Sequence, residues 1–113
     1  MAKVIRLPSA YVIDTKVVGV SKNNDDGTSR QSIIHAAVQE NDRVHLHREP
    51  ENKFDPEAVK VLTQEGGQIG YLAREVAGRV TSALINGVDV RTTVSWVSGD
   101  QMRGVGLRIE LVN

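Results

Sequence analysis

The sequence predicts a small, mainly β domain: an antiparallel barrel of about six strands with one well-defined helix. Two observations predict this class. Short segments rich in β-branched residues recur along the chain, separated by turn formers such as QEGG (64–67) and SGDQM (98–102). One segment, REVAGRVTSALING (74–87), has apolar residues at helical spacing instead. Because the chain has 113 residues, we expect a single domain over 1–113.

The first third of the chain predicts a strand, a polar loop and a segment of two possible conformations. YVIDTKVVGVS (11–21) is rich in β-branched residues and predicts a strand, and KNNDDGTS (22–29) consists of turn formers. In SRQSIIHAAVQEN (29–41), Ser29 is a candidate N-cap for a second, short helix over 30–39 that turns Ile33, Ile34 and Ala37 inward. The Ile-Ile pair is equally compatible with a strand.

An antiparallel meander is predicted over residues 42–73. Its three strands are DRVHLHRE (42–49), EAVKVLT (57–63) and QIGYLA (68–73). In the first strand Val44 and Leu46 alternate with polar side chains, which include Arg43, so we expect one face to be buried and the other exposed.

The last third predicts a helix followed by a hairpin. Val76, Val80 and Leu84 recur at i, i+4 and i+8, and Asn86 with Gly87 is a plausible stop, so the helix is expected over 74–86. VDVRTTVSWVS (88–98) and RGVGLRIELV (103–112) then read as two strands joined by a turn. Many short strands with one main helix are typical of the oligonucleotide-binding (OB) barrel.

Composition excludes several classes of function. Lys plus Arg and Asp plus Glu both number 14, so the formal net charge is zero and a strongly basic wrapper of nucleic acid is excluded. The chain has no cysteine, which excludes disulfide scaffolds, thiolate metal sites and cysteine nucleophiles. The sequence shows no apolar leader and no run of membrane-spanning length, and we expect a cytoplasmic protein.

Two patterns raise the question of metal binding or catalysis. His45 and His47 have a spacing that can ligate zinc, but a site needs three or four ligands and His35 is the only other histidine. Three acids, Glu49, Asp55 and Glu57, lie together in the 49–58 loop. They give the hypothesis of a metal-dependent hydrolase, which ranks below the two binding functions described at the end of this section. Since the chain has no G-x-S-x-G motif and no cysteine, nucleophilic catalysis has no candidate residue and we expect no enzyme. We also expect no metal, because the histidines are too few, and no cofactor.

A more specific pattern lies in the loop after the first meander strand. Phe54 stands between Lys53 and Asp55, and the preceding strand carries Arg43 on its polar face. An aromatic ring near cations is typical of sites that stack a base and hold its phosphate. The alternative is that Phe54 folds inward and fills the core.

Arg74 opens the predicted helix, at the end where the helix dipole disfavours a cation by about 0.3–1 kcal/mol. A helix N-terminus combined with an arginine makes a good phosphate site. The alternative is that Arg74 bends back to pair with Glu75 or Asp55.

Two motifs in this region carry a family resemblance. The pattern V-x-L-x-REP-x-N-x-F-D-P-x-AV-x-V, followed by G-x-IGYL-x-RE-x-A, resembles the HIRAN domain, over about residues 18–87. This module occurs at the N-terminus of some Swi/Snf-like helicases and as free-standing bacterial and phage proteins. The resemblance implies an OB-like barrel that binds single-stranded DNA, and in the helicase-linked members one that grips the 3′-hydroxyl end.

The resemblance also implies residue roles. Phe54 stands where the family's usual Tyr stacks a terminal base, and Asp55 matches an aspartate that accepts a hydrogen bond from the 3′-hydroxyl. Asn52 falls on a loop residue that supports this pocket, and Arg74 on a basic residue that holds phosphate. Tyr71 occupies a position where a His can stand in the helicase-linked members.

The chain departs from the family pattern at one place. Helicase-linked members carry an Arg-Tyr-Tyr run that supplies another stacking ring, and here the corresponding stretch is RQSIIH (30–35). Arg30 keeps the basic role, but Ile33 and Ile34 cannot stack like Tyr. Losing one stacked base costs about 1–3 kcal/mol.

The chemistry of Asp55 agrees with end recognition. A carboxylate in a DNA-binding groove repels phosphate unless it accepts from a donor, and a terminal hydroxyl is such a donor whereas an internal phosphate is not. The alternative is that Asp55 caps the turn before Pro56 as an Asx motif.

The sequence therefore predicts a non-catalytic module that binds single-stranded DNA or DNA 3′ ends, in DNA repair or replication. An alternative is an adaptor that recruits a separately encoded helicase or nuclease. The residues expected to contact DNA are Asn52, Phe54, Asp55, Tyr71, Arg74, Arg30, Arg43 and Lys53.

Overall fold

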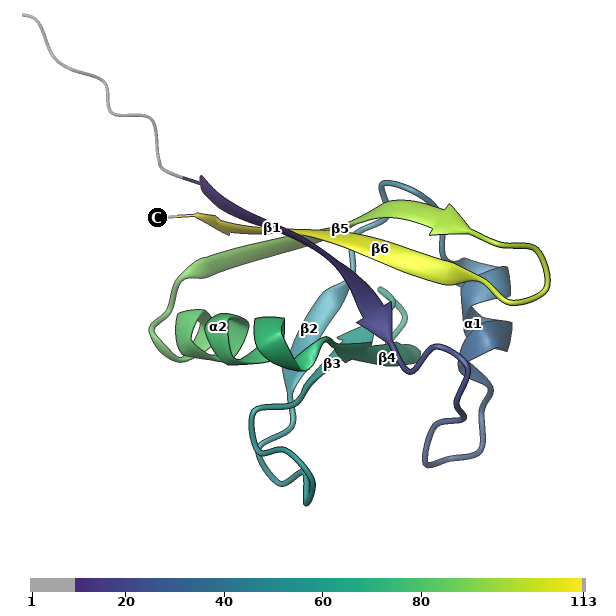
Figure 1. Cartoon of the computed structure of the whole chain (residues 1–113), viewed down its shortest axis with the longest axis horizontal. Coiled ribbons are helices and arrows are strands. Elements are labelled where there is room, and N and C mark those ends of the chain that lie inside the picture. Colours follow the sequence, from purple (N-terminus) through teal and green to yellow (C-terminus); the bar gives the residue numbers. More distant parts are fainter. Residues whose placement is uncertain (1–9, 113) are drawn as a thin grey trace, which may run out of the picture.

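This computed structural model describes residues 10–112, which contain six antiparallel strands and two helices (Figure 1). In chain order the elements are β1 (Ala10–Val18), α1 (Arg30–Ala37), β2 (His45–Arg48), β3 (Val59–Leu62), β4 (Gln68–Leu72), α2 (Arg74–Ile85), β5 (Asp89–Ser98) and β6 (Gly104–Val112). The mainly β class, the number of strands and the helix at 74–86 are confirmed, and α2 ends at Ile85, one residue earlier than expected.

The strands form one sheet in the order β2-β3-β4-β1-β6-β5, which curls into an OB-like half-barrel. The predicted meander and the predicted hairpin are its two halves, and β1 lies between them. β1 pairs with β6 along seven residue pairs, from Ala10 opposite Val112 to Lys16 opposite Gly106, and with β4 through Val17 and Val18.

The open edges of the sheet approach each other just before β2. The predicted strand 42–49 is regular only over β2, and its first residues bond to β5 instead. The Val44 N–H donates to the Thr92 carbonyl (3.1 Å), and the Val94 N–H donates to the Asp42 carbonyl (2.8 Å). Arg43 lies opposite Thr93 in an isolated bridge. These bonds link the first strand of the meander to β5, the first strand of the hairpin.

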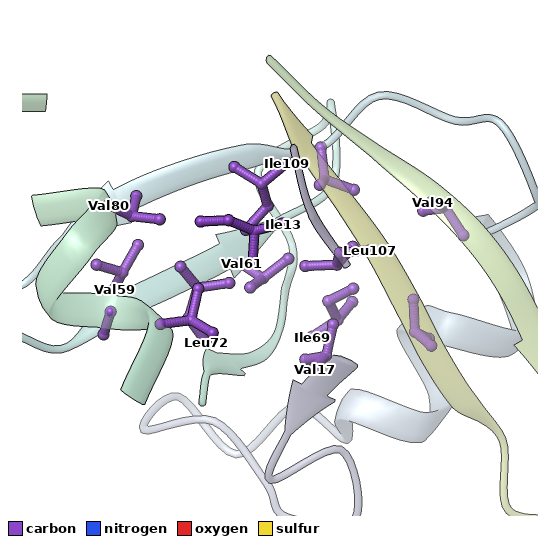
Figure 2. Packing of buried hydrophobic residues seen from close by; sticks show 14 of the residues in the cluster. Ile13, Val17, Val59, Val61, Ile69, Leu72, Val80, Val94, Leu107 and Ile109 are labelled. Carbon is purple, nitrogen blue, oxygen red and sulfur yellow. The ribbon is translucent and has the colours of Figure 1, made fainter. Parts of the chain in front are cut away.

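The core fills the inside of the curl and consists of aliphatic residues. The side chains labelled in Figure 2 come from every strand except β2 and from α2. Those labelled are Ile13, Val17, Val59, Val61, Ile69, Leu72, Val80, Val94, Leu107 and Ile109. All four aromatic residues, Tyr11, Phe54, Tyr71 and Trp96, lie outside this buried core.

The segment at 29–41 forms a helix, which settles the choice between helix and strand. Ser29 is its N-cap and its hydroxyl accepts from the Ser32 N–H (3.1 Å). Ile34 is fully buried and Ile33 packs against the core, as predicted, but Ala37 is exposed because the helix ends there. Val38, which follows the last turn, is buried in its place.

The helix α2 packs its predicted apolar face against the barrel. Val76 and Val80 are buried, and Leu84 packs at the margin of the core. Asn86 is the C-cap of α2, and Gly87 follows with a left-handed φ of 73° that favours glycine. Within residues 10–112 no helix is both long enough and apolar enough to span a membrane.

Candidate functional site

The loop between β2 and β3, residues 49–58, is fixed by its own side chains. The Asn52 side-chain oxygen accepts from two backbone N–H groups, those of Phe54 (2.8 Å) and Asp55 (3.0 Å). The Asn52 N–H in turn donates to the Glu49 carbonyl (3.0 Å). An amide that binds the backbone in this way imposes one turn conformation on a short polar loop. Asn52 therefore supports the conformation of this loop.

Phe54 projects from this fixed loop into solvent. Its side chain is 91% exposed, so it does not fill the core. The loop itself protrudes from the curled sheet beyond the ends of β2 and β3 (Figure 1). A rigidly mounted and exposed aromatic ring gains nothing from burial in the free protein, and it offers one face to a partner.

Glu49 connects the loop to the sheet. Its Oε1 accepts from the Asn52 amide (2.6 Å) and from the Tyr71 hydroxyl (2.9 Å), while its Oε2 lies 2.9 Å from Lys60 Nζ. Burial alone raises the pKa of Glu49, but the bonds from Lys60, Asn52 and Tyr71 outweigh it and hold the pKa below its ordinary value. Burial and the bond to Glu49 raise the pKa of Tyr71. At neutral pH the group is therefore an ionised carboxylate that orients a neutral phenol.

The strand register explains why these side chains meet. In the meander His47 lies opposite Lys60, and Lys60 lies opposite Tyr71. Directly opposed residues project from the same face of a sheet, so the three form a row on the outer face. The predicted alternation of the three strands contained this signal, but the sequence did not connect Glu49 with Lys60 and Tyr71, because their contact depends on the register between strands.

Asp55 lies beside the first turn of α2. Its Oδ2 is 3.6 Å from Arg74 Nε, and its Oδ1 accepts from the Glu57 N–H (2.9 Å). The ion pair considered for Arg74 and the Asx turn considered for Asp55 are therefore both present. The Arg74 side chain is nonetheless 80% exposed, and an exposed pair of this length is weak. The N-cap, Ala73, offers no side-chain acceptor to the N–H groups of this turn. Arg74 and the helix end are thus accessible to an anion.

Two open hollows adjoin on this face. The first is lined by Asp25, Glu49, Glu51, Asn52, Lys53, Phe54 and Tyr71. The second shares Asp25 and extends over His47 and Lys60 toward the β3–β4 turn. The first hollow holds three carboxylates against one lysine, so its electrostatic character is not that of a broad phosphate-binding surface.

Of the four predicted cations only Lys53 lines these hollows; Arg74 pairs with Asp55 outside their lining, and Arg30 and Arg43 lie elsewhere. Arg30 is buried: its Nε donates to the Asn24 side chain (2.7 Å), one Nη donates to the Gly19 carbonyl (2.9 Å), and its guanidinium lies over the Tyr71 ring at 5.4 Å. It therefore supports Tyr71 from inside. Arg43 is exposed but lies at the far end of β2, six residues or about 20 Å of extended chain from Glu49.

The carboxylates of the hydrolase reading have other partners. Glu49 is held by Asn52, Tyr71 and Lys60, and Asp55 faces Arg74. Across residues 10–112 no three His, Cys, Asp or Glu side chains are grouped as they would be to hold a metal ion. The residues that converge here are an exposed aromatic ring, a half-buried tyrosine and a carboxylate–arginine pair.

Comparison with known proteins gives a consistent family. The family model described as HIRAN domain matches residues 11–111. The mouse helicase-like transcription factor is 35% identical over 65 residues, which cover 53% of this chain and 6% of that protein. The chain thus corresponds to a small part of this much longer relative.

Solved structures share the fold. A crystal structure of the HIRAN domain of human HLTF superposes with a TM-score of 0.71 at 23% identity, covering 90% of this chain and 75% of that one. An NMR structure of the HLTF HIRAN domain in its DNA-bound conformation superposes with a TM-score of 0.59 at 22% identity, covering 92% and 79%.

Proposed function

The chain belongs to the HIRAN domain family, and from this premise we propose that it is a non-catalytic module that binds single-stranded DNA and reads its 3′ end. A HIRAN domain of the same fold has been solved in a DNA-bound conformation, which supports DNA as the ligand class. The observation that carries the proposal for this chain is the exposure of Phe54 on a loop that Asn52 holds rigid. Such a ring is suited to stacking on a base. A role in DNA repair or replication follows as part of the same proposal.

In this proposal each group of the site has one task. Phe54 stacks on the terminal base, and Tyr71, held by Glu49, forms the inner wall of the hollow. The 3′-hydroxyl donates to Asp55, whose Oδ2 lies 3.6 Å from Arg74 Nε and has unused acceptor capacity. Arg74 and the N-terminus of α2 hold the adjacent phosphate.

The position of the missing stacking ring limits the strength of this grip. Ile34 is fully buried and Ile33 packs against the core, so neither presents a flat surface to a base. The carboxylates of the first hollow add repulsion toward internal phosphates. Both features favour recognition of a strand end over coating of a long strand.

Fluorescence anisotropy with two labelled oligonucleotides that differ only in a 3′-hydroxyl or a 3′-phosphate tests the proposal. We expect the hydroxyl form to bind at least about tenfold more tightly, or about 1.4 kcal/mol, because a phosphate removes the donor and adds repulsion. Asp55→Asn should shrink this gap, since the amide no longer repels and can donate to phosphate oxygens. Equal affinity of the wild-type protein for both ends would refute end reading.

Phe54→Ala should weaken both ligands alike by about 1–3 kcal/mol, because stacking does not sense the terminal group. Ile85→Ala is the matched control: Ile85 is also a large exposed apolar residue, 62% accessible, but it lies at the C-terminal end of α2. If the two variants bind DNA equally well, Phe54 is not a stacking residue.

A protein adaptor is the second candidate, and the acidic lining of the first hollow favours it. Asp25, Glu49 and Glu51 would suit a basic peptide better than a phosphate chain. In this case the module would recruit a separately encoded helicase or nuclease. Failure of every oligonucleotide to bind at low salt would leave this candidate in place of the first.

A further inference from the structure

Trp96 lies flat on the outer face of the sheet, in a place that two glycines of β6 create. It is opposite Gly106, and a Cβ at Gly106 would overlap the indole ring. At Gly104 a Cβ would be 3.4 Å from Cζ3 of the same ring. One face of the indole is therefore packed against the β6 backbone. The residue is still 39% accessible, which leaves the ring with a fixed orientation and an exposed surface.

The hollow around Trp96 carries an excess of cations. It is lined by Asp14, Thr15, Lys16, Ser95, Trp96 and Arg108, that is, by two cations and one carboxylate. Arg108 Nε lies 3.2 Å from Asp14, but both side chains are more than half exposed, so the pair is weak and leaves other guanidinium donors available. By contrast, the hollow beneath Phe54 has three carboxylates and one cation. Phosphate groups are favoured at Trp96 and disfavoured beneath Phe54.

The strand register places Trp96 and Tyr71 on one continuous surface. Tyr71 lies opposite Val18 on β1, and Lys16, two residues away, projects from the same face. Lys16 lies opposite Gly106, and Gly106 lies opposite Trp96. Directly opposed residues share a face, so the outer surface runs from Tyr71 across exposed Val18 and Lys16 to the indole. From β4 to β5 this path crosses three strand spacings, about 14 Å.

We propose that Trp96 is a second base-stacking platform, and that a single strand whose 3′ end occupies the Phe54 hollow continues across β1 and β6 to reach it. Lys16 and Arg108 hold the phosphates on either side of the stacked base. The inference rests on the proposed function, and it extends the site from one loop to a track on the outer face of the sheet. It also supplies a ring to replace the stacking contact that Ile33 and Ile34 do not provide.

The competing explanation is that the indole only covers the glycines. An aromatic side chain laid over a strand glycine stabilises the sheet by itself. That role requires the packed face of the ring and makes no use of Lys16 or Arg108. A bound strand therefore contacts the exposed face of the indole in the first explanation and leaves it unchanged in the second.

Intrinsic fluorescence of the unmodified protein separates them, because Trp96 is the sole tryptophan of the chain. The probes are 3′-hydroxyl oligodeoxynucleotides of about 3 and about 10 nucleotides, chosen around the range of OB site sizes. We expect the longer one to quench Trp96 emission at the concentrations at which anisotropy reports binding, and the shorter one to bind without quenching. Binding of the longer strand with unchanged emission would overturn the proposal.

Substitutions give a second measurement. Trp96→Ala should weaken the longer oligonucleotide about 5-fold or more and leave the shorter one unchanged, whereas Trp96→Phe should retain most of the affinity. Lys16→Ala should reduce the salt slope for the longer strand by about 0.7, the contribution of one phosphate. Equal loss for both lengths in Trp96→Ala would show a purely structural residue. If anisotropy detects neither oligonucleotide, the proposed function fails first; if it detects both and Trp96 does not respond, only this extension fails.

Discussion

Removing the charge of Glu49 tests whether this residue supports the binding loop. The structure gives its carboxylate three partners, Asn52, Tyr71 and Lys60, at 2.6–2.9 Å. Glu49→Gln keeps the size of the side chain and one acceptor oxygen, but it removes the ion pair and turns an amide donor toward Lys60 or Tyr71. Because a hydrogen bond to a charged group contributes about 1.5–3 kcal/mol and part of the network survives, we expect a loss of about that size in total.

The stability measurement is a thermal melt at several pH values. For a domain of this size each kcal/mol lowers Tm by about 4–8 °C, so the loss at neutral pH should be readily seen. The folded protein holds the pKa of Glu49 below its ordinary value of 4.5. The stabilisation from the charge is therefore fully present above pH 4.5 and is lost as the pH falls through the folded pKa. The Tm difference between wild type and Glu49→Gln should shrink accordingly in acid.

The matched control is Glu51→Gln, since Glu51 lines the same hollow and is exposed. It should melt like the wild type. Glu49→Gln should in addition weaken DNA binding, because Asn52 and Tyr71 lose their common support. A Tm difference that is the same at pH 3 as at pH 7, or equal melting of the two variants, would refute the reasoning.

Four further outcomes are expected. Arg74→Ala should weaken DNA binding by about 1.5–3 kcal/mol. Its Tm should be nearly unchanged, because the exposed pair with Asp55 contributes little to stability. A fall in Tm with intact binding would show that Arg74 is a structural partner of Asp55. In anisotropy, Arg43→Ala should bind like the wild type whereas Lys53→Ala should bind more weakly, and the reverse order would place the DNA at the other end of β2. The slope of log K against log salt should lie between about −1.4 for a short strand and about −2.8 for one that reaches Trp96, and a slope beyond about −5 would mean a larger basic surface. Gly70→Ala should lower the free energy of unfolding by about 2 kcal/mol or more in a denaturant titration, since the φ of Gly70 is 151° and a Cβ would overlap the Val18 carbonyl. The control is Gly66→Ala, where φ is also left-handed but the space for a Cβ is open. An equal loss in the control would show that the clash with Val18 is not the cause.

The elements that local pattern determines were predicted well. The meander followed from alternation in its three strands, and α2 from apolar spacing with a glycine stop. The pairing of β1 could not be predicted in this way, because apolar residues lie on both of its faces: Ile13 and Val17 are buried, and Val12 and Val18 are exposed. Its position between β4 and β6 depends on contacts between distant segments.

In the candidate site, too, the residues identified by a local pattern were predicted, and the contacts between strands were not. Asn52, Phe54 and Asp55 are neighbours in one loop, and a local motif identified them. The link from Glu49 to Tyr71 and Lys60 crosses strands and appears only once the register is known. Arg30 shows the limit of reading charge from sequence, because an arginine that finds a carbonyl, an amide and an aromatic ring can be buried.

The position of β1 has a consequence for how the chain folds. The meander and the hairpin can each form from neighbouring segments. β1 joins the two by pairing with β4 and with β6, and its β6 partners lie 90 residues away at Lys16–Gly106 and 102 residues away at Ala10–Val112. Non-local pairing of this kind is slow, because the entropy of closing a long loop is lost before the contacts are gained. The Phe54 loop and its Glu49 support draw their side-chain contacts from the meander alone. The surface from Tyr71 to Trp96 crosses β1 and β6, so it exists only once this long-range pairing has formed.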